Sequence, residues 1–132
     1  MTEDLFKDID FNGIDYTSLW TDDDPFSGIV NGNGYKIKNL TIDSTEEYVG
    51  LFGATVGAII ENVIIENVNI KGDRYVGALI GKAFLTTITN CGIIGGTVEG
   101  NNNVGGLIGY DDSSEITTSY TELDLVKANM SD

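Results

Sequence analysis

The side chains in this sequence that could do chemistry are above all carboxylates, which gather in two short runs. Asp22, Asp23 and Asp24 form the first run, and Asp111 with Asp112 forms the second. Clustered carboxylate oxygens are the ligands that calcium prefers, although neither run has the ligand spacing of an EF-hand loop. We therefore expect either a calcium site at these residues or a hydrated acidic loop, and no other cofactor.

The side chains that most other kinds of catalysis require are missing from this sequence. The sequence contains no histidine, which removes the commonest general base and excludes a Ser-His-Asp triad. With a single cysteine, Cys91, neither an internal disulfide nor a zinc site is expected. Cys91 is expected to be a small buried apolar residue, with a reactive or metal-binding thiol as the alternative. These observations predict that the protein is not an enzyme.

Three tyrosines provide a candidate binding surface. Tyr48 and Tyr75 share one position of a repeat described below, and Tyr110 lies near another bend. An outward row of these rings could stack on sugar rings or on a protein partner. The alternative is a set of aromatic cross-strand pairs, each contributing about 0.2–1 kcal/mol to stability. We take Tyr48, Tyr75 and Tyr110 as a candidate ligand or partner face, with glycans as possible partners.

The charge balance argues against two classes of partner. Asp and Glu total 21 against 7 Lys and Arg, which gives a formal net charge of −14. Binding to nucleic acid or to anionic lipid by simple electrostatics is therefore disfavoured. The sequence also has no apolar run long enough to span a membrane as a helix.

A repeat sets the architecture. Segments 48–53 (YVGLFG), 75–81 (YVGALIG) and 103–109 (NVGGLIG) repeat one another, and their closing glycines are 28 residues apart. An isoleucine follows each closing glycine by seven residues. These isoleucines are Ile60, Ile88 and Ile116. Self-similarity at a fixed period of this size indicates a solenoid or a repeat array.

The composition of the repeat favours strands over helices. It is dense in Gly, Val, Ile, Asn and Thr, which are poor or middling helix formers, and it lacks the spaced leucines of a leucine-rich repeat. We predict an all-β fold, a parallel β-helix (solenoid) of about four coils with about 28 residues per coil. Three short strands per coil are expected: one at the 48–53 type of segment, one at Ile60, Ile88 or Ile116, and one ending at Ile70 or Val98.

One domain, 1–132, is expected, with residues 1–25 as an irregular N-terminal entry that covers the first coil and residues 26–128 as the coils. The first coil is expected to be short. If Ile37 and Ile42 match Ile60 and Ile65, that coil has only 23 residues.

Interior columns follow from stacking, because equivalent residues of adjacent coils lie about 4.8 Å apart. Ile60, Ile88 and Ile116 should form one column, and Leu40, Val63 and Cys91 another. A ladder of asparagine side chains is also expected at a bend, formed by Asn39, Asn62 and Asn90, with Thr118 in the last coil. The alternative for these asparagines is a row of ligand-binding amides.

Polysaccharide lyases and hydrolases also occur on β-helices, so they are the enzymatic alternative. Such enzymes need paired carboxylates, or calcium with a basic residue, on one face. Asp43, Glu66, Glu99 and Glu115 are available, and Arg74 is the only arginine. No pair at the separation found in glycosidases can be placed from the sequence. Analogy of fold alone does not license an activity.

Segment 26–42 (FSGIVNGNGYKIKNLTI), followed by YVGLFG, VGALIG and VGGLIG, resembles the GLUG-motif repeats. Segment 8–16 (DIDFNGIDY) resembles the usual lead-in of that family. The family occurs in large bacterial surface and secreted proteins, including non-catalytic parts of some immunoglobulin A peptidases. The resemblance implies a right-handed parallel β-helix, an extracellular or cell-surface location and no catalytic residues.

The functional expectation is a non-catalytic structural or adhesive module of such a protein: a stalk, a spacer or a binding segment. The first six residues lack the basic and apolar regions of a signal peptide, which favours a fragment of a longer protein. Expected partners are other domains of the same chain, or a second copy stacked end to end, since an uncapped coil can pair with another chain.

Overall fold

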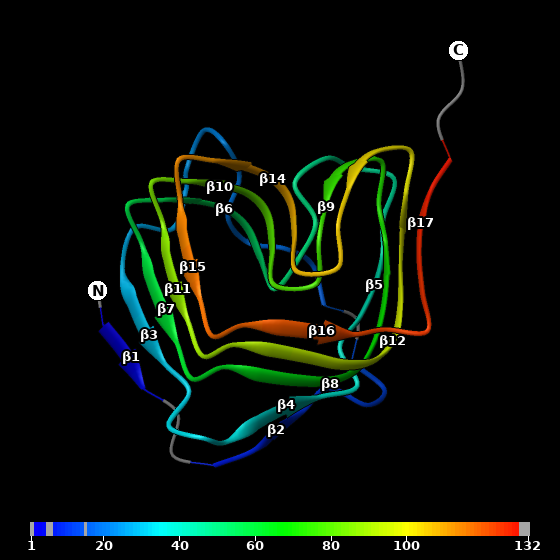
Figure 1. Ribbon diagram of the computed structural model, residues 1–132. Helices are drawn as coiled ribbons and strands as arrows, with labels where there is room; N and C mark the ends of the chain where they lie inside the picture. Colours follow the sequence, from blue (N-terminus) through cyan, green and yellow to red (C-terminus); the bar gives the residue numbers. More distant parts are fainter. Residues whose placement is uncertain (1, 5–6, 15, 130–132) are drawn as a thin grey trace.

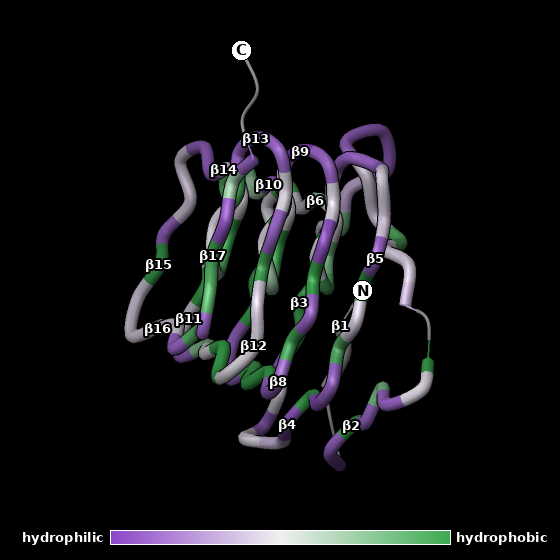
Figure 2. The backbone as a smooth tube through the Cα atoms, turned by 90° about the vertical axis from the view of Figure 1, so that its right-hand side faces the viewer, coloured by the Kyte–Doolittle hydropathy of each residue, from purple (hydrophilic) through white to green (hydrophobic). Residues whose placement is uncertain are grey.

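The computed structural model describes residues 2–4, 7–14 and 16–129, and all of its regular structure is β-strand. The strands form successive coils of one solenoid of about four turns, which Figure 1 shows along the solenoid axis. In that view the chain runs anticlockwise, and Figure 2, seen from the right-hand side of Figure 1, places the last coil nearest the viewer of Figure 1. The coil is therefore right-handed, and the fold predicted from the sequence is confirmed.

In the described residues, four parallel sheets run along the axis, and every strand pairing in them is between neighbouring coils. The first sheet contains β1 (Thr2–Asp4), β3 (Ile29–Asn31), β7 (Ile59–Glu61), β11 (Thr87–Thr89) and β15 (Glu115–Thr117). The second contains β2 (Ile9–Asp10), β4 (Lys36–Lys38), β5 (Thr41–Asp43), β8 (Ile64–Lys71), β12 (Gly92–Gly100), β16 (Tyr120–Glu122) and β17 (Leu125–Ala128). The third contains β6 (Phe52–Val56), β10 (Ile80–Phe84) and β14 (Ile108–Asp112), and the fourth contains β9 (Arg74–Val76) and β13 (Asn102–Val104).

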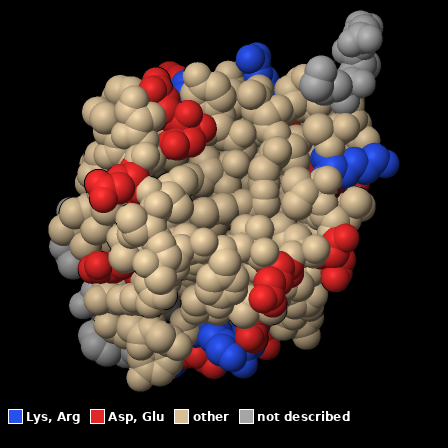
Figure 3. Space-filling view, in the orientation of Figure 1, with Lys and Arg blue, Asp and Glu red and all other residues tan. Residues whose placement is uncertain are grey.

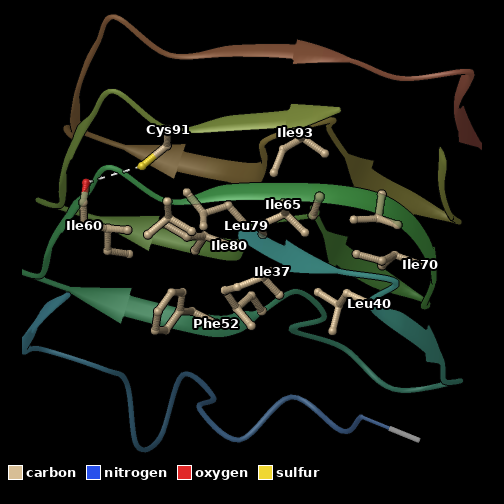
Figure 4. Close-up of a cluster of buried hydrophobic side chains, with 14 of the residues drawn as sticks. Ile37, Leu40, Phe52, Ile60, Ile65, Ile70, Leu79, Ile80, Cys91 and Ile93 are labelled. Atoms are coloured by element: carbon tan, nitrogen blue, oxygen red, sulfur yellow. Dashed lines mark hydrogen bonds between the residues drawn. The ribbon is translucent and has the colours of Figure 1, made fainter. Parts of the chain in front are cut away.

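The register of the sheets produces the predicted column of Ile60, Ile88 and Ile116. Ile88 pairs with Ile60 on one side and with Ile116 on the other, so these three residues lie in line. Ile60 and Ile88 are fully buried, whereas Ile116, in the last described coil, is 43% exposed. The expected column of Leu40, Val63 and Cys91 is wrong in its first member, because Thr41 pairs with Asn69 and Leu40 therefore lies in line with Val68. Ile37, Ile65 and Ile93 form a second column, which is visible in Figure 4. Each fully buried aliphatic side chain stabilises the fold by about 1.5–3 kcal/mol.

Cys91 lies in this core, as predicted. It is fully buried, and its thiol contacts the backbone oxygens of Ile60 (3.6 Å) and Thr89 (3.5 Å) (Figure 4). Burial raises the pKa of the Cys91 thiol, so the thiol stays protonated and unreactive at neutral pH.

The first coil is not short, and the 23-residue coil expected from the sequence is wrong. Ile37 pairs with Ile65, not with Ile60, and Ile42 pairs with Ile70. The residue that pairs with Ile60 is Val30. The first coil instead carries two additional residues between these strands. The Asn33-Gly34 turn, in which both residues have positive φ (54° and 79°), accommodates them.

The expected asparagines do form hydrogen-bonded ladders, but in two separate rows and not in one. The Asn90 amide donates to Asn62 Oδ1 (2.9 Å), and the Asn62 amide donates to Asn31 Oδ1 (3.0 Å). Asn39, expected in the same row, belongs to the second ladder: it donates to Asp10 Oδ1 (2.8 Å) and accepts from Asn67 (2.7 Å). Asn39, Asn62, Asn67 and Asn90 all have φ between 55° and 61°, so they occupy the left-handed corners of the coil. The structural role predicted for these amides is confirmed.

The N-terminal segment does more than cover an edge irregularly. Its strand β1 pairs in parallel with β3, and β2 pairs in parallel with β4 with the same 28-residue offset as the later coils. Trp20 then packs on the first coil, with its ring 5.0 Å from Phe26 and 5.1 Å from Phe52. Tyr16 donates its hydroxyl to the Leu51 carbonyl, and burial raises the pKa of Tyr16 to about 12.

The repeated motif forms an additional feature that the sequence analysis did not predict. Segments 48–53, 75–81 and 103–109 turn into the solenoid between the second and third sheets, and we call each of them an inward loop (Figure 1). A complete coil therefore has four strands, such as β9 to β12, and not the three expected. The inward loop of 75–81 buries the side chains of Val76, Ala78, Leu79 and Ile80 completely.

The glycines of the motif are needed because the two arms of each inward loop touch through their backbones. A Cβ atom added to Gly81 would lie 2.5 Å from the Tyr75 carbonyl oxygen and 2.6 Å from that of Gly53 in the neighbouring coil. Added to Gly77, it would lie 2.7 Å from the Gly109 nitrogen. Backbone atoms cannot move aside as a flexible side chain can, so a side chain at these positions would force the coils apart.

We predict that Gly81→Ala lowers the free energy of unfolding by about 3 kcal/mol through overpacking. Gly57→Ala is the matched control, because Gly57 has φ 65° but no atom within 4 Å of an added Cβ. Backbone conformation alone should then cost about 1 kcal/mol. Urea unfolding followed by circular dichroism measures both. Equal losses in the two variants would contradict the close packing of the inward loop.

Candidate ligand-binding face

The candidate face begins at the first residue of the inward loop, where the backbone is left-handed. Tyr48 (φ 62°), Tyr75 (φ 58°) and Asn103 (φ 54°) occupy this position in successive coils. Asparagine tolerates such a conformation, whereas a bulky residue at positive φ is unusual. The coil geometry thus sets the backbone here, and two of the three coils place a tyrosine where asparagine would be the less strained residue.

The structure brings the three predicted tyrosines together. The rings of Tyr48 and Tyr75 stack, with centroids 5.1 Å apart and planes 16° from parallel. Tyr110 meets Tyr75 edge-on, at 5.8 Å and 79°. The position equivalent to Tyr48 and Tyr75 is occupied by Asn103 in the third coil. Tyr110 belongs to a different column, on β14. The rings therefore form a cluster across one inward loop and not a straight row.

Two cations lie against this aromatic cluster. The guanidinium carbon of Arg74 is 4.8 Å from the centre of the Tyr75 ring. The Lys82 ammonium is 5.5 Å from the Tyr75 ring and 6.0 Å from the Tyr110 ring. All three distances fall in the range of cation–π attraction. Lys82 also pairs with Asp22 (3.2 Å), and this hydrogen bond raises the pKa of Lys82.

These side chains surround a surface depression of about 450 Å³, a volume typical of small-molecule sites. It lies over β6, β10 and β14 and reaches across to β9. Its lining residues are Asp22, Val56, Arg74, Tyr75, Lys82, Phe84, Tyr110 and Asp112. We call it the tyrosine depression.

Sequence reasoning missed four of these residues as site residues: Val56, Arg74, Lys82 and Phe84. The 28-residue offset could have indicated two of them, Lys82 and Phe84, as site residues. Lys82 stands one coil before Tyr110, and Phe84 one coil before Asp112, in the same outward columns. Applied to the tyrosines, the offset would have indicated Lys82 as a neighbour.

The aspartates of the two acidic runs do not lie together in one site. Asp22 faces Lys82 in the tyrosine depression, and Asp112 lines the same depression while accepting from the Ser113 hydroxyl (2.9 Å). Asp23 lines a second depression, of about 430 Å³, and Asp24 and Asp111 are exposed. Among the described residues no group of three or more acidic or cysteine side chains is arranged to hold a metal ion. Calcium binding at these residues stays a prediction from the sequence.

The second depression was not predicted. It lies between the N-terminal segment and the 42–49 connection, and its lining is rich in acidic and hydroxyl side chains. Its polar lining residues include Tyr16, Ser18, Asp23, Asp43, Glu46 and Glu47.

The carboxylates considered for a glycosidase do not gather in one place. Glu66 pairs with Lys36 (3.0 Å), and Glu99 accepts from the Asn129 amide (2.7 Å). Asp43 lies in one column with Glu99, but Lys71 lies between them, and Glu115 is on β15 of another sheet. Figure 3 shows the acidic side chains spread around the rim of the end face.

Several much longer proteins resemble this chain. Halomucin of Haloquadratum walsbyi is 39% identical over 114 residues, which are 83% of this chain and 1% of halomucin. An immunoglobulin A1 protease of Streptococcus sanguinis is 33% identical over 92 residues, 70% of this chain and 5% of the protease. A protein of Evansella cellulosilytica named as a Gly-rich membrane protein is 33% identical over 90 residues, 61% of this chain and 10% of that protein. The chain thus spans a tenth or less of these relatives.

No family model matches the sequence, and no solved structure matches it. The similarity to an immunoglobulin A1 protease agrees with the resemblance found in the motifs. In the described part of the chain there is no helix long and apolar enough to cross a membrane.

The contact between Asp22 and Lys82 can be tested by its effect on titration. Because the pKa of Lys82 is raised, the pair's contribution is complete at neutral pH and is lost as pH rises through that pKa. We predict that Asp22→Asn lowers the pKa of Lys82, measured by NMR of its side-chain carbon. The neighbouring carboxylate supplies the control, since Asp23→Asn should leave that pKa almost unchanged. A Lys82 pKa unaffected by Asp22→Asn would show that the pair does not form in solution.

Proposed function

We propose that this chain is a non-catalytic module of a cell-surface or secreted protein, in which the solenoid acts as a stalk or spacer and presents a binding face. The observation that carries the proposal is the unbroken register of the parallel sheets through successive coils. This arrangement makes a stiff body whose core residues all serve stacking. The outward side chains of each coil can then vary without disturbing the fold.

The relatives support this role. One of them is named as a membrane protein and another as a protease of an immunoglobulin, and in each the matching segment is a small part of a long chain. A short matching segment in several long and differently named proteins is the pattern expected of a module and not of a catalytic domain. Membership of the GLUG-motif family, with an extracellular location, belongs to the same proposal.

The open end of the solenoid supports stacking on a further coil. Ile116 and Val126 in the last described coil are 43% and 44% exposed, and they continue columns that are buried in the coils behind them. The middle of this end face has few charged side chains (Figure 3). We propose that another coil of the same cross-section covers it, from the same longer protein or from a second copy.

The absence of enzymatic activity is also part of the proposal. It is supported by the lack of histidine and by the dispersal of the carboxylates over different sheets. A screen of acidic and neutral polysaccharides, with and without calcium, should give no new reducing ends and no unsaturated products. Release of either product, abolished by a carboxylate substitution, would favour the polysaccharide-acting alternative.

Labelling on intact cells tests the location. In the full-length protein in its own organism, a membrane-impermeant maleimide should label the Glu47→Cys variant, because Glu47 is exposed. The unaltered protein is the control, because its Cys91 is fully buried and should not be labelled in this chain. We expect the additional labelling before cell lysis. Labelling of the variant only after lysis would place the module inside the cell and overturn the proposed location.

A further inference from the structure

The tyrosine depression has the composition of a sugar-binding site. Tyr110 (41% exposed) and Phe84 (38% exposed) present apolar ring surface at its edge, and Tyr75 forms part of its wall. Aromatic side chains combine an apolar surface with, in tyrosine, a polar tip. Asp22 and Asp112 add acceptors, and the depression thus brings aromatic surface and charged groups together in one concavity.

The backbone gives an independent reason to regard the rings as more than packing. At the position shared by Tyr48, Tyr75 and Asn103 the backbone is left-handed, which strains a bulky side chain. Asparagine, which the third coil has, suits this conformation better. Tyrosine persists in two coils next to the depression despite this strain.

Arg74 indicates which kind of sugar the depression would take. It is the only arginine of the chain, and its guanidinium group lies over the Tyr75 ring. Among the described residues it has no carboxylate within ion-pairing distance, although acidic residues outnumber basic ones by 21 to 7. Its Nε donates only a long hydrogen bond to Asn103 Oδ1 (3.4 Å). The guanidinium fork is therefore available to an external carboxylate, with which it can form two parallel hydrogen bonds.

The other carboxylates of the depression have partners of their own, since Asp112 accepts from the Ser113 hydroxyl (2.9 Å) and Asp22 pairs with Lys82 (3.2 Å). Lys82 is already paired with Asp22, so the two largely neutralise each other. A cationic ligand would meet both Lys82 and Arg74 against the rings, and a neutral sugar would leave Arg74 without a partner. A ring with a carboxylate uses both the aromatic surface and the guanidinium group.

We propose that the tyrosine depression binds a pyranose residue carrying a carboxylate, with its ring against Tyr110 and its carboxylate on Arg74. This inference deepens the binding role proposed above and rests on it. The cell-labelling experiment is independent of it, so a failure to bind sugar would leave the proposed location standing.

Titrations followed by ¹H–¹⁵N NMR test the proposal. Two acidic probes, methyl β-D-glucuronide and the methyl glycoside of N-acetylneuraminic acid, distinguish a uronic acid from a sialic acid. Methyl β-D-glucoside is the neutral match of the first. We expect saturable shifts at the amides of Tyr75, Lys82 and Tyr110 with at least one acidic probe. The glucoside should bind about tenfold more weakly than the glucuronide if the uronic acid is the ligand.

Variants separate the two contacts. Arg74→Gln should weaken binding of the acidic probe by about tenfold, with Arg74→Lys in between, and Tyr110→Ala should weaken all binding severalfold. Lys71→Gln removes a cation from the second sheet and should change nothing. Well-dispersed spectra show that each variant is folded. The proposal is overturned if neither acidic probe shifts these amides, or if Arg74→Gln binds the acidic probe as well as the unaltered chain.

Discussion

Every feature of this protein depends on hydrogen bonding between the backbones of successive coils. A parallel pairing that continues around a whole coil requires adjacent coils to have the same number of residues between corresponding strands. The offset of 28 residues recurs in all the sheets of the later coils. In the first coil, two additional residues are accommodated at a corner, in the Asn33-Gly34 turn. Register is therefore the property that selection on this sequence must preserve first.

The same constraint explains both the motif and the surface. The inward loop brings Val76, Leu79 and Ile80 to the axis, which fills the interior of a coil that would otherwise be too wide. Its glycines allow two backbones to touch, and its left-handed first residue directs a side chain outward at a fixed place in every coil. An outward column can thus collect rings and charges without altering the core.

Sequence analysis succeeded where the information was periodic. The period predicted the solenoid, the Ile60, Ile88 and Ile116 column and the burial of Cys91, because all of these repeat at one offset. It failed in the first coil, where the Asn-containing corner after Val30 and the one after Ile37 look alike. The inward loop could not be foreseen, since a glycine-rich apolar segment fits a wall strand equally well.

The site was only partly predictable, for a similar reason. The three tyrosines repeat closely enough to be noticed, and the structure places them together. Contacts around the coil have no period, so nothing in the sequence relates Asp22 to Lys82, 60 residues later. Arg74 could be singled out as the only arginine, but its place over Tyr75 depends on the corner conformation.

The stacking of equal coils can be measured most directly by cross-linking. The hydroxyls of Thr89 and Thr117 are 3.3 Å apart on neighbouring strands, and residues paired in this way lie within the Cα separation that a disulfide needs. With Cys91 replaced by alanine, Thr89→Cys combined with Thr117→Cys should form an intramolecular disulfide on mild oxidation, whereas Thr87→Cys combined with Thr117→Cys should not. A disulfide in the shifted pair, or none in the aligned pair of the folded protein, would contradict the 28-residue register.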